Sequence, residues 1–281
     1  MWVSPLPLIS YLLSGYHFNL NFLIPPTNTS QTGISRQRVL SSDYHQLAEK
    51  TDTIAIEEPL EIQLIGEKDI LPVTISITMR TPGQDENLAL GFLFTEGILY
   101  SHEEVEQVSF PDENMICVHL VEGKEYDLQK TDRNFYATSS CGVCGKASID
   151  AIHTQSLFDI HQDQARWNPT VLRRLPNMLR EHQSLFSQTG GIHAAGLFSQ
   201  EGEQLILRED IGRHNALDKV IGEGFSKGLL PFRESILMLS GRASFELVQK
   251  AAIAGIPVIA AIGAPSSLAI SLAKEKVITL I

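Results

Sequence analysis

Two cysteines separated by two residues carry the clearest chemistry in this chain. They lie in Ser139-Ser140-Cys141-Gly142-Val143-Cys144-Gly145 and are two of only three cysteines in 281 residues. The glycines have no Cβ, so another molecule can approach the backbone and both thiols closely. A short helix is predicted to follow, and its dipole would favour thiolate over thiol. Cys141 and Cys144 are therefore candidate catalytic residues for metal binding, disulfide formation or sulfur transfer.

Zinc binding and thioredoxin-like redox chemistry fit this sequence less well. A structural zinc site needs four ligands, and the chain has no second cysteine pair. His102-x-Glu104 followed by the cysteine pair resembles the zinc-deaminase signature, but Ser140 stands where that signature has proline. A thioredoxin-like pair is expected near the start of a small domain, whereas this loop lies mid-chain. The third cysteine, Cys117, lies in an apolar stretch and is predicted to be a buried strand residue.

The C-terminal part of the chain has the pattern of an α/β unit. Continuous apolar runs alternate with helical segments, which is typical of a parallel sheet covered on both faces. The predicted strands span 236–239, 257–262 and 277–281, and the predicted helices span 243–254 and 267–275. A hairpin over 192–207 and a helix over 213–225 are predicted to precede them. Two further helices, over 157–166 and 170–186, are predicted before the hairpin.

Both strand-to-helix junctions of this unit are rich in glycine and serine. Free backbone N–H groups at a helix start bind anions, and ligands of open α/β sheets gather at the carboxyl edge of the strands. The guanidinium of Arg242 adds a positive fork suited to phosphate. Together these features predict a site for a pyrophosphate or a nucleotide; the alternative is ordinary helix capping and tight turning. The candidate cofactor-binding residues at the two junctions are Ser240, Gly241, Arg242, Ser244, Gly263, Ser266 and Ser267.

A third polar cluster lies at the start of the helix predicted over 213–225. Arg213 and His214 fall in its first turn, where the helix dipole disfavours cations, so they need an anionic side chain or an anionic ligand. The alternative is a solvated helix start capped by Asp210, with its charges paired along the helix. His193 lies in a predicted strand between small residues that leave room for a ligand. We include His193, Arg213 and His214 among the candidate cofactor-binding residues.

Composition and charge limit the class of protein. The formal net charge of −11 argues against a nucleic-acid-binding surface, which needs a basic patch. Three cysteines, two of them close together, suit a reducing cytoplasm. No secretory signal or membrane span is predicted, because residues 1–35 have no basic start and polar residues interrupt their apolar run. We expect a poorly ordered extension over 1–50, an α+β domain over 51–135, and an α/β domain over 136–281 that begins with the cysteine loop.

Several of these motifs resemble one family closely. The chain is similar to the FdhD family of formate dehydrogenase accessory sulfurtransferases from about Ile54 onward. The matching segments are Glu58-Pro59-Leu60-Glu61-Ile62, Gly91-Phe92-Leu93-Phe94-Thr95-Glu96-Gly97, Ser140 to Gly145, Gly191-Ile192-His193-Ala194-Ala195, Glu209 to Gly222 and Leu239 to Leu268.

The resemblance implies a sulfur relay. A cysteine desulfurase would pass a persulfide sulfur to Cys141, and Cys144 would assist its transfer or its release. The sulfur would then reach the molybdenum cofactor, Mo-bis(molybdopterin guanine dinucleotide), before that cofactor enters formate dehydrogenase. The resemblance also implies a cytidine-deaminase-like fold for the α/β domain, a homodimer, and no permanently bound metal. The alternatives are a zinc-dependent deaminase-like hydrolase and a molybdopterin-binding chaperone that transfers no sulfur.

The end of the chain departs from the family pattern. Family members usually continue past the last strand with a Gly-Phe-x-Arg-type segment, whereas this sequence stops at Ile281. Either the sequence is a truncated reading frame or its affinity for the cofactor is impaired, and in both cases the resemblance implies that the sulfur-accepting loop is retained.

Overall fold

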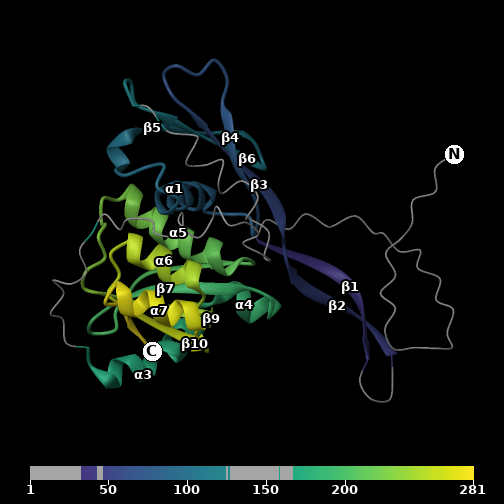
Figure 1. Cartoon of the computed structure of the whole chain (residues 1–281). Helices are drawn as coiled ribbons and strands as arrows, with labels where there is room; N and C mark the ends of the chain where they lie inside the picture. The colour runs from purple at the N-terminus through teal and green to yellow at the C-terminus, as the bar shows by residue number, and fades with distance from the viewer. Residues whose placement is uncertain (1–32, 43–46, 125, 127–157, 159–166) are drawn as a thin grey trace, which may run out of the picture.

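The structure is a computed structural model that describes residues 33–42, 47–124, 126, 158 and 167–281. Cys141 and Cys144 lie outside the described residues, as does most of the helix predicted over 157–166. The described residues form two sheets with helices packed between them, and a separate hairpin (Figure 1).

The N-terminal sheet has four strands and one long helix on its inner face. Strands β3 and β6 are parallel neighbours at its centre, and each has an antiparallel strand on its other side. Alternate residues of β3, namely Leu60, Ile62 and Leu64, are fully buried, as expected for a sheet with one covered face. The elements are β3 (Glu58–Ile65), β4 (Val73–Arg80), α1 (Asp85–Thr95), the 3-10 helix η1 (His102–Glu104), β5 (Val105–Asp112) and β6 (Met115–Leu120).

The second sheet has five strands in the order β11-β10-β9-β7-β8. Strands β9, β10 and β11 are parallel, whereas β7 runs antiparallel to both of its neighbours. Strand β8 therefore runs in the same direction as β9 and β10. The strands are β7 (His193–Ser199), β8 (Gln204–Asp210), β9 (Ser235–Arg242), β10 (Val258–Gly263) and β11 (Thr279–Leu280).

Helices cover both faces of this five-stranded sheet. One face packs in a single apolar core with α5, α6, α7, α1 and the N-terminal sheet, and the other face packs against α3. Figure 1 shows the resulting layers, with α1 and α5 lying between the two sheets. The helices are α3 (Pro169–His182), α4 (Ser184–Thr189), α5 (Arg213–Ser226), α6 (Phe245–Ile253) and α7 (Ser267–Glu275).

Helices α1 and α5 join the two halves through direct backbone contact. A Cβ on Gly91 would lie 1.9 Å from the carbonyl oxygen of Asp218, and a Cβ on Gly222 would lie 1.8 Å from that of Asn87. Only residues without a side chain permit this approach. The two glycines therefore set the separation of the two halves.

The α/β prediction is confirmed for the described part of the chain. The strand-helix-strand-helix-strand order after residue 235 matches the expected unit, and Cys117 lies in β6 with a buried side chain. Several boundaries differ. Strand β9 continues to Arg242, beyond the predicted end at residue 239, because Arg242 pairs with Gly263 of β10. The helix predicted over 170–186 is broken at Gln183, and the Glu209 carboxylate accepts hydrogen bonds from the backbone of Leu185 and Phe186 at the start of α4.

A long hairpin, which was not predicted from the sequence, lies partly within the segment 1–50. Strands β1 (Ile34–Ser42) and β2 (Leu47–Ala55) pair with each other along their full length and extend away from the rest of the fold (Figure 1). Their side chains are mostly exposed, so the segment lacks the strong apolar alternation that identifies a half-buried strand. Within the described residues, no helix combines the length and the hydropathy that crossing a membrane requires.

Candidate functional site

Three helices begin at one edge of the five-stranded sheet. Helix α5 follows β8, α6 follows β9 and α7 follows β10, and these three strands run in the same direction. Strand β7 runs the opposite way, so its first residue, His193, lies at the same edge, opposite Asp210 in the ladder. The sequence predicted two helix starts here, and the structure adds that of α5. Three sets of free N–H groups facing one edge favour a ligand with several negative charges.

His193 lies at the centre of this edge. The ring of His193 packs over Gly241, where an added Cβ would come within 3.4 Å of its Nδ1 atom. Burial lowers the pKa of His193, and the nearby Arg213 and His214 lower it further, against a smaller opposing effect of Asp210. The imidazole is therefore held neutral near pH 7, with one nitrogen able to donate and the other able to accept. The hydroxyl oxygen of Ser240 accepts a hydrogen bond from the backbone N–H of Ala194 at 2.8 Å, which joins β9 to β7 beside this ring.

The first turn of α5 presents two of the predicted cationic residues. The Nε2 atom of His214 lies 2.9 Å from a carboxylate oxygen of Glu246 on α6 and 3.4 Å from the hydroxyl of Ser244. This hydrogen bond from His214 lowers the pKa of Glu246, against the opposing effect of burial. A neighbouring side chain thus supplies the anion for His214. The Nε atom of Arg213 is buried and has no hydrogen-bond partner among the residues that the structure describes.

The other two helix starts are built differently. Ser244 is the N-cap residue of α6 but makes no capping hydrogen bond with its side chain. The hydroxyl of Ser266 accepts from the backbone N–H of Ala269, so Ser266 acts as an ordinary cap of α7. Ser267 is exposed in the first turn of α7. Gly263 permits the close passage of Arg242, because an added Cβ would lie 2.7 Å from the Cγ atom of Arg242.

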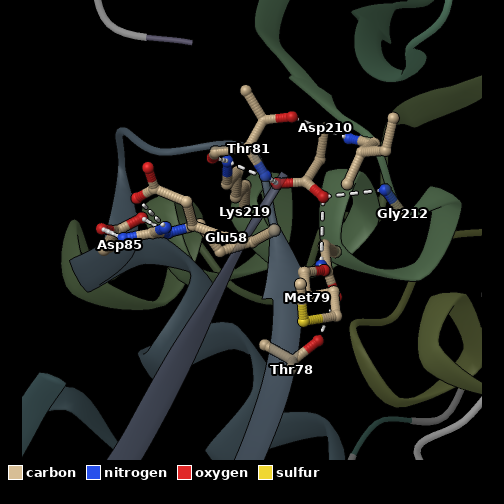
Figure 2. Close-up of polar contacts among 11 residues, drawn as sticks. Glu58, Thr78, Met79, Thr81, Asp85, Asp210, Gly212 and Lys219 are labelled. Carbon is tan, nitrogen blue, oxygen red and sulfur yellow. Dashed lines mark hydrogen bonds and ion pairs between the residues drawn. The ribbon is translucent and has the colours of Figure 1, made fainter. Parts of the chain in front are cut away.

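A buried polar cluster lies next to this edge, between the end of β4 and α5. It consists of Thr81, Asp210, Asn215 and Lys219. The Asp210 and Lys219 side chains are 0% and 1% exposed and form an ion pair at 2.7 Å. Figure 2 shows Asp210 between the end of β4 and the start of α5, with Lys219 beside Thr81. It also shows Glu58 and Asp85, which pair with the buried Arg80 guanidinium at 3.4 and 3.0 Å.

Comparison with known proteins identifies the family. The model of the FdhD/NarQ family matches residues 55–281. The chain belongs to this family. The match covers both sheets, the carboxyl edge and the cysteine pair.

Relatives within the FdhD/NarQ family match this chain over most of their length. It is 46% identical over 256 residues to the sulfur carrier protein FdhD of Mycolicibacterium paratuberculosis, which covers 88% of this chain and 92% of that protein. It is 48% identical over 263 residues to the protein of that name from Mycobacterium tuberculosis, covering 89% and 92%. A crystal structure described as a formate dehydrogenase accessory protein from Desulfotalea psychrophila is similar with a TM-score of 0.67 and 25% identity, over 88% of this chain and 91% of that one. The alignment with the Mycolicibacterium paratuberculosis protein includes more residues of this chain than the range 55–281 contains. It therefore also includes part of the β1–β2 hairpin.

The predicted site residues of this FdhD/NarQ chain divide into two groups. The structure brings together His193, Arg213, His214, Ser240, Gly241, Arg242, Ser244, Gly263, Ser266 and Ser267 along the edge where α5, α6 and α7 begin. Cys141 and Cys144 lie outside the described residues, so their placement relative to this edge stays a prediction. Within the described part of the chain, no group of three or more His, Cys, Asp or Glu side chains has the geometry to hold a metal ion.

Sequence reasoning missed the buried charges at the end of β8 and along α5. The alternative of a solvated helix start is wrong for Asp210, Asp218 and Lys219, which are all at most 2% exposed. A second buried cluster joins α5 to α6, because Lys250 lies 3.0 Å from the Asp218 carboxylate and donates to Thr95 at 2.7 Å. Burial raises the pKa of Asp218, while Lys250 partly opposes that shift. The available signal was the spread of apolar residues and glycines around all sides of α5, which is typical of a helix buried on every face.

Proposed function

We propose that this chain is a sulfur carrier that accepts sulfur from a cysteine desulfurase and delivers it to the molybdenum cofactor of formate dehydrogenase. The observation that carries the proposal is its near full-length similarity to relatives named sulfur carrier protein FdhD. The similarity to a formate dehydrogenase accessory protein supports the same role. The receiving compound is Mo-bis(molybdopterin guanine dinucleotide), which the chain handles as a substrate.

Cys141 is the proposed sulfur acceptor. Its thiolate attacks the outer sulfur of the desulfurase persulfide, the donor S–S bond breaks, and the donor cysteine leaves as a thiolate. Cys144 then attacks the Sγ atom of Cys141, which releases the outer sulfur as hydrosulfide to the cofactor and leaves a disulfide. A dithiol reductant restores both thiols. The two-residue spacing of the pair supports this second step.

The carboxyl edge is the proposed site for the phosphates of the cofactor. Arg213 and Arg242 provide guanidinium groups for bidentate contacts with phosphate oxygens, and Ser244, Ser266 and the first N–H groups of α6 and α7 surround the same edge. The neutral imidazole of His193 can donate and accept hydrogen bonds to a guanine or pterin ring. The buried, unpartnered Nε of Arg213 supports an anionic ligand at this position.

The wider assignment follows from the same family membership. We propose a cytidine-deaminase-like fold for the α/β domain, which a mixed five-stranded sheet with helices on both faces supports. A domain boundary near residue 135, a homodimer and a cytoplasmic location complete the proposal. The small number of cysteines supports a reducing compartment.

Intact-mass measurement tests the sulfur relay. Incubation with a cysteine desulfurase and cysteine should add about 32 Da to the wild-type protein, one sulfur atom per chain. Cys141→Ser should abolish the adduct, and Cys144→Ser should retain it but slow its release. Cys117→Ser is the matched control, because Cys117 is 2% exposed and burial raises the pKa of its thiol, so it should load like wild type.

Three other outcomes would contradict the proposal. An adduct that persists in Cys141→Ser would exclude Cys141 as the acceptor. Stoichiometric zinc that is lost on the same substitution would favour a deaminase-like hydrolase. Full support of formate dehydrogenase by Cys141→Ala would favour a chaperone that binds the cofactor without transferring sulfur.

A further inference from the structure

The turn between β8 and α5 is held by hydrogen bonds from a distant part of the chain. One oxygen of the Asp210 carboxylate accepts from the backbone N–H of Gly212 at 2.8 Å and from the amide of Asn215 at 3.0 Å. The other oxygen accepts from the backbone N–H of Thr81 at 3.2 Å and pairs with Lys219. A buried carboxylate with this many donors has one favourable orientation, since moving it leaves several groups unsatisfied.

The end of β4 completes this arrangement. The Lys219 ammonium also donates to the carbonyl of Thr81 at 2.9 Å, and the Thr81 hydroxyl accepts from the N–H of Ile211 at 3.1 Å. The Asn215 amide donates to the carbonyl of Met79 at 2.7 Å. The N-terminal sheet is therefore bonded to both sides of the turn that precedes Arg213.

Little space remains for a side chain at Gly212, at the centre of this turn. A Cβ on Gly212 would lie 3.0 Å from the Asn215 amide nitrogen and 3.4 Å from the Asp210 carboxylate. The Asp210–Asn215 hydrogen bond thus passes directly over Gly212. The backbone that places Arg213 and His214 at the edge is consequently set by the Asp210 carboxylate, and residue Asp210 itself lies opposite His193 in the β7–β8 ladder.

We infer that Asp210 is a positioning residue for the phosphate-binding edge, and that the N-terminal sheet takes part in the site through the contact of Thr81 with Asp210. This inference rests on the proposed function, because it assigns the edge to the nucleotide part of the cofactor. Asp210 acts through Arg213, His214 and His193, and it contributes no atom to the sulfur-transfer steps at Cys141.

Guanosine diphosphate is the probe, because it carries the guanine and the diphosphate of the proposed substrate. Asp210→Asn should weaken its binding by about tenfold, measured by calorimetry, because the new amide N–H₂ faces the donors of Thr81 and Lys219. Asp218→Asn is the matched control: Asp218 is also buried in an ion pair on α5, but its partners are Lys250 and Thr95. That variant should bind within about twofold of wild type. Both variants should still accept sulfur at Cys141.

The pKa of His193, followed by NMR, gives a readout that a loss of stability alone would not move. The charged groups that act on this ring are Arg213, His214 and Asp210, and only Asp210 raises its pKa. Asp210→Asn should therefore lower the pKa of His193, whereas Asp218→Asn should leave it unchanged. Thr81→Val keeps the Asp210–Lys219 pair but removes the acceptor for Ile211, and it should weaken diphosphate binding if Asp210→Asn does not fold.

Each outcome decides the inference. Wild-type affinity in folded Asp210→Asn and Thr81→Val would overturn it, as would an equal loss in Asp218→Asn, because affinity would then follow stability. If the wild-type chain failed to bind guanosine diphosphate, the proposed function would fail at this edge. In that case the pKa of His193 would still test the positioning role. An unchanged pKa in Asp210→Asn would overturn it, and a lowered pKa would support it.

Discussion

Replacement of Gly91 by alanine tests the contact that joins the two halves of the fold. Alanine is the better helix former by about 1 kcal/mol, so helix propensity alone predicts that Gly91→Ala stabilises the protein. The structure predicts the opposite. The new Cβ would lie 1.9 Å from the carbonyl oxygen of Asp218 and 2.8 Å from the backbone nitrogen of Gly222, and neither backbone atom can rotate away.

The magnitude follows from the separation that the methyl group forces. Ordinary van der Waals contact begins at 3.4 Å, so α1 and α5 must move apart by roughly 1.5 Å at this point. A gap of about 1 Å forfeits up to half of the dispersion energy of the facing atoms. With the strain of overpacking, the cost is about 3–5 kcal/mol, and after the gain in helix propensity the net loss is about 2–4 kcal/mol.

Urea and thermal unfolding measure this loss directly. At this chain length the expected decrease in Tm is about 5–15 °C. Gly191→Ala is the control, because a Cβ there would meet only the carbonyl of Thr189, at 3.8 Å. Gly222→Ala should cost a similar amount, and the double variant should cost less than the sum, since either methyl group already separates the helices. A Gly91→Ala protein as stable as wild type would refute the backbone contact between α1 and α5.

Three other perturbations test separate parts of the structure. Lys250→Met should reduce the free energy of unfolding by about 3–5 kcal/mol, because it leaves the Asp218 carboxylate buried without its cation. Urea unfolding measures this loss, and adding Asp218→Asn to the same protein should recover part of it. His193 has a pKa below its ordinary value of 6.5, so the unfolded chain takes up the proton first and stability should fall as pH drops below about 6.5. His193→Gln should remove this part of the pH dependence, and a stability curve identical to that of wild type would contradict the assignment. Gly263→Ala should displace Arg242 and weaken guanosine diphosphate binding by about fivefold without changing sulfur loading at Cys141, as calorimetry and intact mass would show.

The α/β half was predictable because its signals are local. Continuous apolar strands, capped helices and the Gly/Ser junctions each depend on residues close in sequence, so the order of elements from β9 to β11 followed directly. The grouping of Arg242 and Ser266 at one edge then followed from the direction of parallel strands. His193 lies at the same edge because β7 runs antiparallel to its neighbours, and the sequence did not indicate that β7 pairs with β9.

The features that were missed depend on contacts between distant residues. The helix break at Gln183 is stabilised by Glu209, a strand residue that follows it in the chain. The charged residues of α5 are of types that are usually exposed to solvent. They are buried only because α1 and β4 pack against that helix. The β1–β2 hairpin was missed for a different reason, since each of its strands pairs with the other while most of its side chains stay exposed.

The sequence by itself determined the residues on which the proposed chemistry depends: a pair of thiols separated by two residues, and glycine- and serine-rich helix starts at one edge of an α/β sheet. Residue type and short-range spacing encode both properties, and the resemblance to a family depends on the same residues. Only the tertiary structure decided how that edge is held. The burial of Asp210 and Lys219 requires β4 and α5 to meet, and Gly91 and Gly222 allow that meeting because they bring α1 and α5 into backbone contact. Desolvation of a charge depends on everything that surrounds it, which is why local sequence does not predict it.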